Sequence, residues 1–250
     1  MNLDRIIAVR NDKTIYHDGD RCVKSFNENY RKHDIMNEAR NHALLEESGL
    51  NVPEFIGVEK INGKWSIISE FISGKTLTEL MEENSEKRAE YMELFVDLQL
   101  SVHKKRGTLL NRQDDQFKRR IDSSDLPATV RYSLATVIDD IPNRTYQICH
   151  GDFTPSNIIV KEDGTPYIID WSHAALGNVK ADMALSYLLF WMRGKIDLAA
   201  MYLKVLGEKA GIEEEEVLFW MPVVAASLYA KCSNEEREFL LSWINDIHHN

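Results

Sequence analysis

Short apolar runs separated by turn residues open the chain and predict a small antiparallel sheet. Each run is rich in β-branched or aromatic residues, and Asn62-Gly63, between the last two runs, is a favoured two-residue hairpin turn. One helix interrupts the runs and is closed by Gly49, a good C-terminal cap. The predicted strands are residues 6–9, 14–16, 22–26, 56–61 and 64–70, and the predicted helix is residues 29–48.

Beyond residue 74 the spacing of apolar residues changes to that of helices. Thr76 followed by Glu79 predicts a capping box, no further strand is expected before residue 158, and residues 112–121 are expected to form a charged surface segment. We therefore expect an α+β chain with a β-rich lobe at 1–72 and a mainly helical lobe at 73–250. The later predicted helices are residues 87–104, 126–140, 180–192, 196–210, 214–231 and 234–247.

Two short apolar runs at residues 158–160 and 167–169 predict a β-hairpin, with Asp163-Gly164 in the connection between them. A hairpin brings its two ends together, so Asn157, before the first strand, and Asp170, after the second, are expected side by side. Asp152 precedes them in a His-Gly-Asp sequence at residues 150–152. Two carboxylates and an amide oxygen are suited to holding Mg²⁺ next to a base. The alternative is that these are ordinary turn-forming residues.

The bulk properties narrow the class of protein. With 250 residues, 44% of them hydrophobic, the chain can bury a core, and a net charge of −10 argues against nucleic acid or an anionic membrane as the main partner. Three scattered cysteines indicate a reduced protein without a zinc site. The first ten residues lack a signal-peptide pattern, and the apolar runs at 183–192 and 217–230 are shorter than a membrane span. We therefore expect a cytoplasmic protein.

Lys24 lies in the third predicted strand and Glu38 on the first predicted helix. Taken alone, each would be interpreted as a solvated surface residue. Together with the His-Gly-Asp sequence, Asn157 and Asp170, their order resembles the protein-kinase-like fold, with its small antiparallel β lobe and helical lobe. More closely, it resembles the aminoglycoside phosphotransferase and choline kinase family of small-molecule kinases. The motif covers residues 149–184 tightly, and the order of the upstream residues extends the resemblance loosely over the chain.

The resemblance implies an enzyme that transfers the γ-phosphoryl group of ATP or GTP to a hydroxyl of a small molecule. Lys24 would bind the α- and β-phosphates and would be oriented by an ion pair with Glu38. Asp152 would accept the proton of the attacking hydroxyl or orient it. Asn157 and Asp170 would hold Mg²⁺ between the phosphates. This division of roles suits phosphoryl transfer, which needs charge neutralisation and alignment more than covalent help.

Main-chain groups of Glu70, Phe71 and Ile72 would contact the adenine edge as the hinge between lobes, again by resemblance. The acceptor pocket is expected in the helical lobe, near Asp152 and three aromatic residues of the later helices. The acidic charge and the family together favour an amine-bearing acceptor. The expected pocket residues are Trp191, Trp220 and Tyr229.

Two departures from kinase patterns bear on the subtype. Gly151 occupies the position where a protein kinase typically has Arg, and the gap between Asp170 and the helix near Lys180 is too short for a long activation loop. A protein kinase is therefore not expected. The turn at residues 10–13 lacks the glycines of a phosphate-covering loop. That absence leaves open an alternative class, a non-catalytic kinase-fold module that binds a nucleotide or a partner.

Overall fold

The computed structural model describes residues 3, 5–10, 12–107, 109–141 and 146–245. The chain divides into two compact units, each built from two segments. Unit 1 contains Met1–Glu83 and Pro155–His173, and unit 2 contains Asn84–Thr154 and Ala174–Asn250. Unit 1 therefore includes the hairpin from the middle of the chain. The assignment of nucleotide and acceptor binding to lobes at 1–72 and 73–250 stays a prediction.

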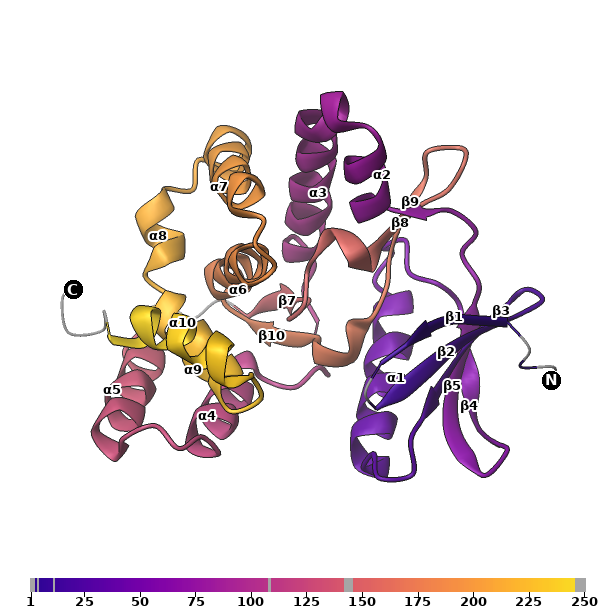
Figure 1. Cartoon of the computed structure of the whole chain (residues 1–250), viewed down its shortest axis with the longest axis horizontal. Coiled ribbons are helices and arrows are strands. Elements are labelled where there is room, and N and C mark those ends of the chain that lie inside the picture. Colours follow the sequence, from indigo (N-terminus) through magenta and orange to yellow (C-terminus); the bar gives the residue numbers. More distant parts are fainter. Residues whose placement is uncertain (1–2, 4, 11, 108, 142–145, 246–250) are drawn as a thin grey trace. The chain divides into compact units, whose positions relative to one another are not determined.

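Unit 1 is organised around a five-stranded antiparallel sheet in the order β1-β2-β3-β5-β4. The five predicted strands are confirmed, and Asn62 and Gly63 both have positive φ, as the tight hairpin turn between β4 and β5 requires. The helix α1 lies against this sheet (Figure 1) and buries Phe26, Ile35 and Ile67 between them. The elements are β1 (Arg5–Val9), β2 (Lys13–Asp18), β3 (Arg21–Phe26), α1 (Lys32–Glu46), β4 (Phe55–Ile61) and β5 (Lys64–Glu70).

The predicted central hairpin is confirmed as β8 (Ile158–Val160) and β9 (Pro166–Ile168). The expectation that no strand would come between β5 and this hairpin is wrong, because β6 (Lys75–Thr76) pairs with β8. Two residues are too few to show a strand pattern. Gly74 permits the pairing, since a Cβ there would lie 2.3 Å from the carbonyl oxygen of Val160. The helix α2 (Leu77–Glu83) follows β6 directly.

The capping box at the start of α2 is also confirmed. The main-chain N–H of Thr76 donates to the carboxylate of Glu79 at 2.7 Å, and the N–H of Glu79 donates to the hydroxyl of Thr76 at 3.2 Å. Short 3₁₀ turns flank the hairpin at Pro155–Asn157 and Trp171–His173, and another, at Ser85–Lys87, precedes the first helix of unit 2.

Unit 2 is mainly helical and contains a small sheet in which β7 and β10 pair antiparallel. Neither three-residue strand was expected, again because so short a run carries no periodicity. The elements are α3 (Arg88–His103), α4 (Gln113–Asp122), α5 (Ala128–Asp139), β7 (Gln147–Cys149), β10 (Ala175–Gly177), α6 (Val179–Met192), α7 (Ile196–Ala210), α8 (Glu214–Leu218), α9 (Met221–Tyr229) and α10 (Asn234–Ile244).

Two predictions in unit 2 are wrong. The charged segment at residues 112–121 is not a simple surface segment but largely the helix α4, whose Phe117 and Ile121 are buried. The predicted helix at 214–231 is two helices, α8 and α9, because Pro222 lies in the first turn of α9, where a proline is tolerated but cannot continue a preceding helix. None of the helices in the described ranges is long and apolar enough to cross a membrane.

Candidate active site

Lys24 is the centre of the charged cluster in unit 1. It lies in β3 between Ile15 of β2 and Ile67 of β5. Its ammonium contacts Oε1 of Glu38 at 2.5 Å and Oδ1 of Asp170 at 3.0 Å. Glu38 comes from α1 and is only 5% exposed. The surface interpretation of these two residues taken alone is therefore wrong: the fold brings a strand lysine, a helix glutamate and the residue after the hairpin together.

The charges in this cluster stabilise one another against the cost of burial. Burial acts to lower the pKa of Lys24, but the carboxylates of Asp170 and Glu38 outweigh it and leave this pKa raised. Burial acts to raise the pKa of Asp170, but Lys24 and Lys13 outweigh it and leave this pKa lowered. Lys24 and Asp170 are therefore both ionised at neutral pH.

The hairpin brings the main chain of Asn157 beside Ile169, the residue before Asp170. That the side chains of Asn157 and Asp170 lie side by side stays a prediction. Ile158 pairs with Ile168, and one step further the N–H of Ile169 donates to the carbonyl oxygen of Asn157 at 2.9 Å. Asp170 itself has a φ of +60°, in the left-handed region that aspartate tolerates better than most residues but still at a cost. A strained conformation of this kind persists only where the surroundings enforce it. Here the two lysines hold its carboxylate.

The chemistry of these residues fits a divalent cation bound together with phosphates. Asp170 offers a carboxylate that is 25% exposed, and Asn157 offers an amide oxygen, both of which are hard oxygen ligands. Mg²⁺ usually takes one or two such protein ligands and completes its shell with phosphate oxygens and water. Within the described residues, Oε2 of Glu38 is buried without a hydrogen-bond partner, so this cluster retains an unused acceptor.

The predicted hinge at Glu70, Phe71 and Ile72 follows β5 directly. The N–H of Glu70 donates to the carbonyl oxygen of Glu54 at 2.9 Å, and the N–H of Phe71 donates to that of Asp20 at 2.8 Å. The ring of Phe71 stacks on His17, with 3.6 Å between the centroids. Two of the three N–H groups are thus bonded within unit 1, so an adenine edge would have to be read by other main-chain groups of this segment. Its role stays a prediction.

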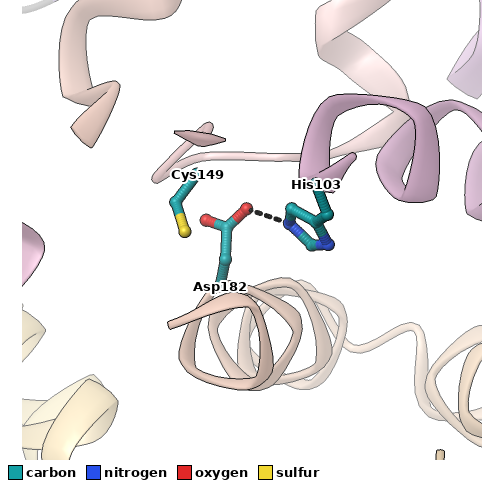
Figure 2. Close-up of side chains that lie close together, drawn as sticks. All are labelled: His103, Cys149 and Asp182. Carbon is teal, nitrogen blue, oxygen red and sulfur yellow. Dashed lines mark hydrogen bonds and ion pairs between the residues drawn. The ribbon is translucent and has the colours of Figure 1, made fainter. Parts of the chain in front are cut away.

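In unit 2 the loop that carries Asp152 is held by Asp182 of α6. Asp182 is 1% exposed and accepts hydrogen bonds from the N–H of His150 (3.1 Å), the N–H of Gly151 (2.8 Å) and Nε2 of His103 (2.9 Å). Figure 2 shows its carboxylate lying between His103 and Cys149. The N–H of Asp152 donates to Nδ1 of His150 at 3.2 Å. These hydrogen bonds therefore fix the main chain of His150 and Gly151, the two residues before Asp152.

Gly151 has a φ of +77°, which a side chain would strain. The backbone conformation at residue 151 therefore favours glycine over the arginine that is typical of protein kinases. Sequence reasoning missed Asp182 as a functional residue, because a carboxylate in the first turn of a helix is explained by the helix dipole alone. Its position near the start of the helix that follows the hairpin was the available signal.

His103, Cys149 and Asp182 offer ligand atoms within 4.8 Å of one another, but the cluster is better explained as structural. Burial acts to raise the pKa of Asp182, yet the bonds from His103 and Gly151 leave it lowered, so its charge is used by these donors. Burial and the Asp182 charge raise the pKa of the Cys149 thiol well above its usual value. A buried thiol whose pKa is raised in this way is not a nucleophile at neutral pH.

Arg120 of α4 is a second residue that the sequence reasoning missed. Its guanidinium interacts electrostatically with Asp152. Seven residues earlier, and thus on the same side of the helix, Oε1 of Gln113 accepts a hydrogen bond from the N–H of Asn178 at 3.0 Å. This face of α4 is therefore turned inwards. Residues 112–121 were expected to form a charged surface segment, so Arg120 was not predicted as a site residue.

The aromatic residues proposed to surround the acceptor differ in their exposure. Trp220 is 3% exposed and belongs to the core. Trp191 is half-buried, and its ring stacks on that of Phe239, with 6.2 Å between the ring centroids. The guanidinium of Arg237 lies 4.9 Å from the ring of Tyr229. The location of an acceptor pocket near these residues stays a prediction. A cavity of about 330 Å³ lies elsewhere in unit 2, lined by Tyr187, Ala200, Leu203, Lys204, Gly207, Ile212, Glu213 and Glu214.

Known proteins share the fold of this chain. No curated protein matches the sequence. A thermostable mutant of the aminoglycoside phosphotransferase APH(4)-Ia in its apo form has a TM-score of 0.72 at 12% identity, covering 98% of this chain and 93% of that one. The choline kinase LicA from Streptococcus pneumoniae has a TM-score of 0.66 at 14% identity, covering 100% of this chain and 94% of that one.

A ternary complex of an APH(4)-Ia mutant with AMP-PNP and hygromycin B has a TM-score of 0.70 at 14% identity, covering 98% of this chain and 92% of that one. At such identities the likeness shows the fold, which is protein-kinase-like, with an antiparallel sheet followed by a mainly helical part. The model of the phosphotransferase enzyme family matches residues 10–219, most of the chain. The chain therefore belongs to the phosphotransferase enzyme family.

Proposed function

We propose that this protein is a small-molecule kinase that transfers the γ-phosphoryl group of ATP or GTP to a hydroxyl group. The observation that carries the proposal is the contact of Lys24 with both Glu38 and Asp170, at the mouth of a hairpin that also positions Asn157. An ammonium group between two carboxylates, beside hard oxygen ligands for a divalent cation, suits the binding of a nucleoside triphosphate with its metal ion. Membership of the phosphotransferase family supports the same reaction.

The residues of unit 1 bind the nucleotide. Lys24 binds the α- and β-phosphates, and its ion pair with Glu38 holds the ammonium in place for them. Asp170 and Asn157 hold Mg²⁺, which when bound neutralises phosphate charge as it develops during transfer. Glu70, Phe71 and Ile72 border the adenine. Nucleotide binding is supported by the fold neighbours bound to AMP-PNP and AMP.

Asp152 of unit 2 accepts the proton of the acceptor hydroxyl or orients that hydroxyl. The hydroxyl oxygen forms a bond to the γ-phosphorus as the bond from that phosphorus to the β–γ bridging oxygen breaks. The products are the phosphorylated acceptor and a nucleoside diphosphate, and the hydroxyl proton passes to Asp152. Asp182 positions Asp152 indirectly, because it accepts hydrogen bonds from the N–H groups of His150 and Gly151, the two residues before Asp152.

An amine-bearing acceptor is the substrate class we propose. The chain has a net charge of −10, and fold neighbours include a complex with the aminoglycoside hygromycin B and a choline kinase. A protein substrate is disfavoured, because α6 begins at Val179, nine residues after Asp170 (179 − 170), which leaves no room for a long activation loop. The competing class is a non-catalytic module that binds nucleotide, and it is favoured by the absence of glycines in the β1–β2 turn.

An acceptor panel tests the proposal. Aminoglycosides, choline-like amino alcohols and neutral or anionic hydroxy compounds are incubated with Mg·ATP or Mg·GTP, and nucleoside diphosphate release is measured in a coupled assay. We expect an amine-bearing compound to stimulate release and Asp152→Asn to lower kcat about 10²- to 10⁴-fold, the usual range for a lost general base. Asp163→Asn, in the exposed hairpin turn, is the matched control and should leave kcat unchanged.

The outcomes separate the alternatives. Turnover that Asp152→Asn leaves intact would remove Asp152 from its assigned role. Stimulation by neutral or anionic compounds alone would refute the amine-bearing class while keeping the kinase. Nucleotide binding without turnover of any acceptor would favour the non-catalytic module.

A further inference from the structure

Lys13 is a charged residue of unit 1 to which the family pattern assigns no role. It is the first residue of β2, directly after the β1–β2 turn. Its ammonium lies 3.4 Å from Oδ2 of Asp170, and its side chain is 17% exposed, no more than that of Lys24. Of the turn residues, Asn11 lies outside the described part of the chain. The turn is closed by the N–H of Arg10, which donates to the carbonyl oxygen of Lys13 at 2.8 Å.

Strand register directs Lys13 and Lys24 to the same face of the sheet. Lys13 pairs with Phe26, and Ile15 pairs with Lys24. Residues two apart in a strand share a face, and so do residues directly opposite one another in an antiparallel pair. Lys13, Ile15 and Lys24 therefore project from one face, with the two lysines as diagonal neighbours. Both ammonium groups reach the carboxylate of Asp170, Lys24 at Oδ1 and Lys13 at Oδ2.

The sequence around Lys13 explains why a side chain is needed here. From residue 5 to residue 18 the chain contains no glycine. A glycine-rich turn lets main-chain N–H groups approach phosphates closely, which residues with a Cβ hinder. The β1–β2 turn of this chain lacks that means of binding phosphate. A lysine at the first position after the turn supplies a cation on a flexible four-carbon stem instead.

The contact with Asp170 indicates which part of the nucleotide Lys13 would bind. A divalent cation on Asp170 would repel the two ammonium groups that share its carboxylate. Lys24 keeps a second partner in Glu38, at 2.5 Å, whereas among the described residues Lys13 forms an ion pair with Asp170 alone. Lys13 then needs another anion within the reach of its side chain. The phosphate oxygens that arrive with the cation are the nearest candidates.

We propose that Lys13 binds the terminal phosphates of the nucleotide, in place of a glycine-rich loop, and makes binding selective for the triphosphate. The inference rests on the proposed function, because it needs a nucleotide on unit 1. Lys24 contacts the α- and β-phosphates, and Lys13, which contacts Oδ2 of Asp170, contacts the β- and γ-phosphates. AMP lacks both of these phosphates, so its binding is independent of Lys13.

Equilibrium binding of AMP, ADP and ATP, each with Mg²⁺, to wild type and Lys13→Met tests the inference by isothermal titration calorimetry. We expect the variant to bind ATP about ten- to a hundredfold more weakly, as for loss of one charged hydrogen bond, and to bind AMP as wild type does. Lys13→Arg should retain most of the ATP affinity. Lys64→Met is the matched control, an exposed lysine at the first position of β5 in the same sheet, and should not change any affinity.

A measurement on the wild-type protein covers the case in which Lys13→Met fails to fold. Acylation of Lys13 by an amine-reactive ester, followed by mass spectrometry, should be slowed by Mg·ATP and not by Mg·AMP. Equal ATP affinity of wild type and Lys13→Met, or equal protection by ATP and AMP, would overturn the role of Lys13 while leaving the kinase proposal intact. Absence of nucleotide binding by the wild type would overturn both.

Discussion

Replacing Asp182 by Asn tests whether the loop before Asp152 is held by a buried charge. The side chain keeps its size, but only one of its two terminal atoms still accepts hydrogen bonds. In the wild type Oδ1 accepts from Gly151, and Oδ2 accepts from both His150 and His103. If the amide oxygen of the variant faces Gly151, its NH₂ group faces two donors. The N–H of His150 then loses the carboxylate acceptor.

The expected magnitude follows from these contacts. Leaving a buried donor without its acceptor costs about 1–3 kcal/mol, and the bonds that survive lose their charge assistance, at about 1–2 kcal/mol more. Asp182 is 1% exposed, so water does not replace the lost acceptor. His103 relieves part of the loss only by moving its proton to Nδ1, an atom that is buried without a partner among the described residues. We therefore expect Asp182→Asn to lower the free energy of unfolding by about 2–5 kcal/mol.

Urea unfolding followed by circular dichroism measures this change. The matched control is Asp197→Asn, because Asp197 also lies in the first turn of a helix, α7, but is exposed. It should cost only the helix-dipole contribution, about 0.3–1 kcal/mol. In the phosphotransfer assay Asp182→Asn should lower kcat about ten- to a hundredfold, since small displacements of a catalytic group are costly. KM for the nucleotide should stay unchanged, because the proposed nucleotide ligands belong to unit 1.

Asp182→Asn as stable as Asp197→Asn, within about 0.5 kcal/mol, would refute the reasoning. So would an intact kcat in a destabilised variant, because the buried carboxylate would then hold the fold without positioning Asp152.

Two further predictions concern the charged groups. The pKa of Asp182 is lowered in the folded protein, so its contribution to stability is present above the unfolded value near 3.9 and is lost as the pH falls through the folded value. The difference in unfolding free energy between wild type and Asp182→Asn should therefore narrow below about pH 4, and a difference that is constant from pH 6 to pH 3 would contradict this. Lys24→Met leaves Glu38 and Asp170 without their shared cation and should cost about 2–4 kcal/mol in urea unfolding, less than a fully buried pair because Asp170 is 25% exposed. Lys24→Met/Glu38→Gln should recover part of that loss, and a double variant less stable than Lys24→Met would show that the two residues are not coupled in this way.

Short stretches of the sequence were enough to predict several elements of this fold. Each of the five strands of the first sheet has an apolar run of its own, and Asn62-Gly63 specifies a tight turn by its tolerance of positive φ. The capping box at Thr76 and Glu79 and the turn at Asp163-Gly164 are likewise decided by residues a few positions apart. The pairing of β8 with β9 could be predicted for the same reason, because the pairing of a short hairpin is itself a local matter.

The parts that the sequence left undetermined depend on contacts between distant residues. The strands β6, β7 and β10 exist because a partner strand lies beside them, and two or three residues show no periodicity of their own. The helix α4 is highly polar, and only the tertiary structure shows that its Phe117 and Ile121 are buried.

Contacts between distant residues also determine the surroundings of the charged residues. Lys24 and Glu38, taken alone, looked like solvated surface residues, and the helix dipole explained Asp182, because the sequence alone does not show what faces a side chain. The fold decided that Lys24 meets two carboxylates, that Lys13 shares one of them, and that Asp182 accepts three donors away from water. Burial without a partner is costly for a charge, so each such charge depends on residues brought to it from elsewhere in the chain. The hairpin could be predicted from its own residues, whereas the ion pairs of Lys24 and Lys13 and the buried hydrogen bonds of Asp182 were decided by tertiary structure.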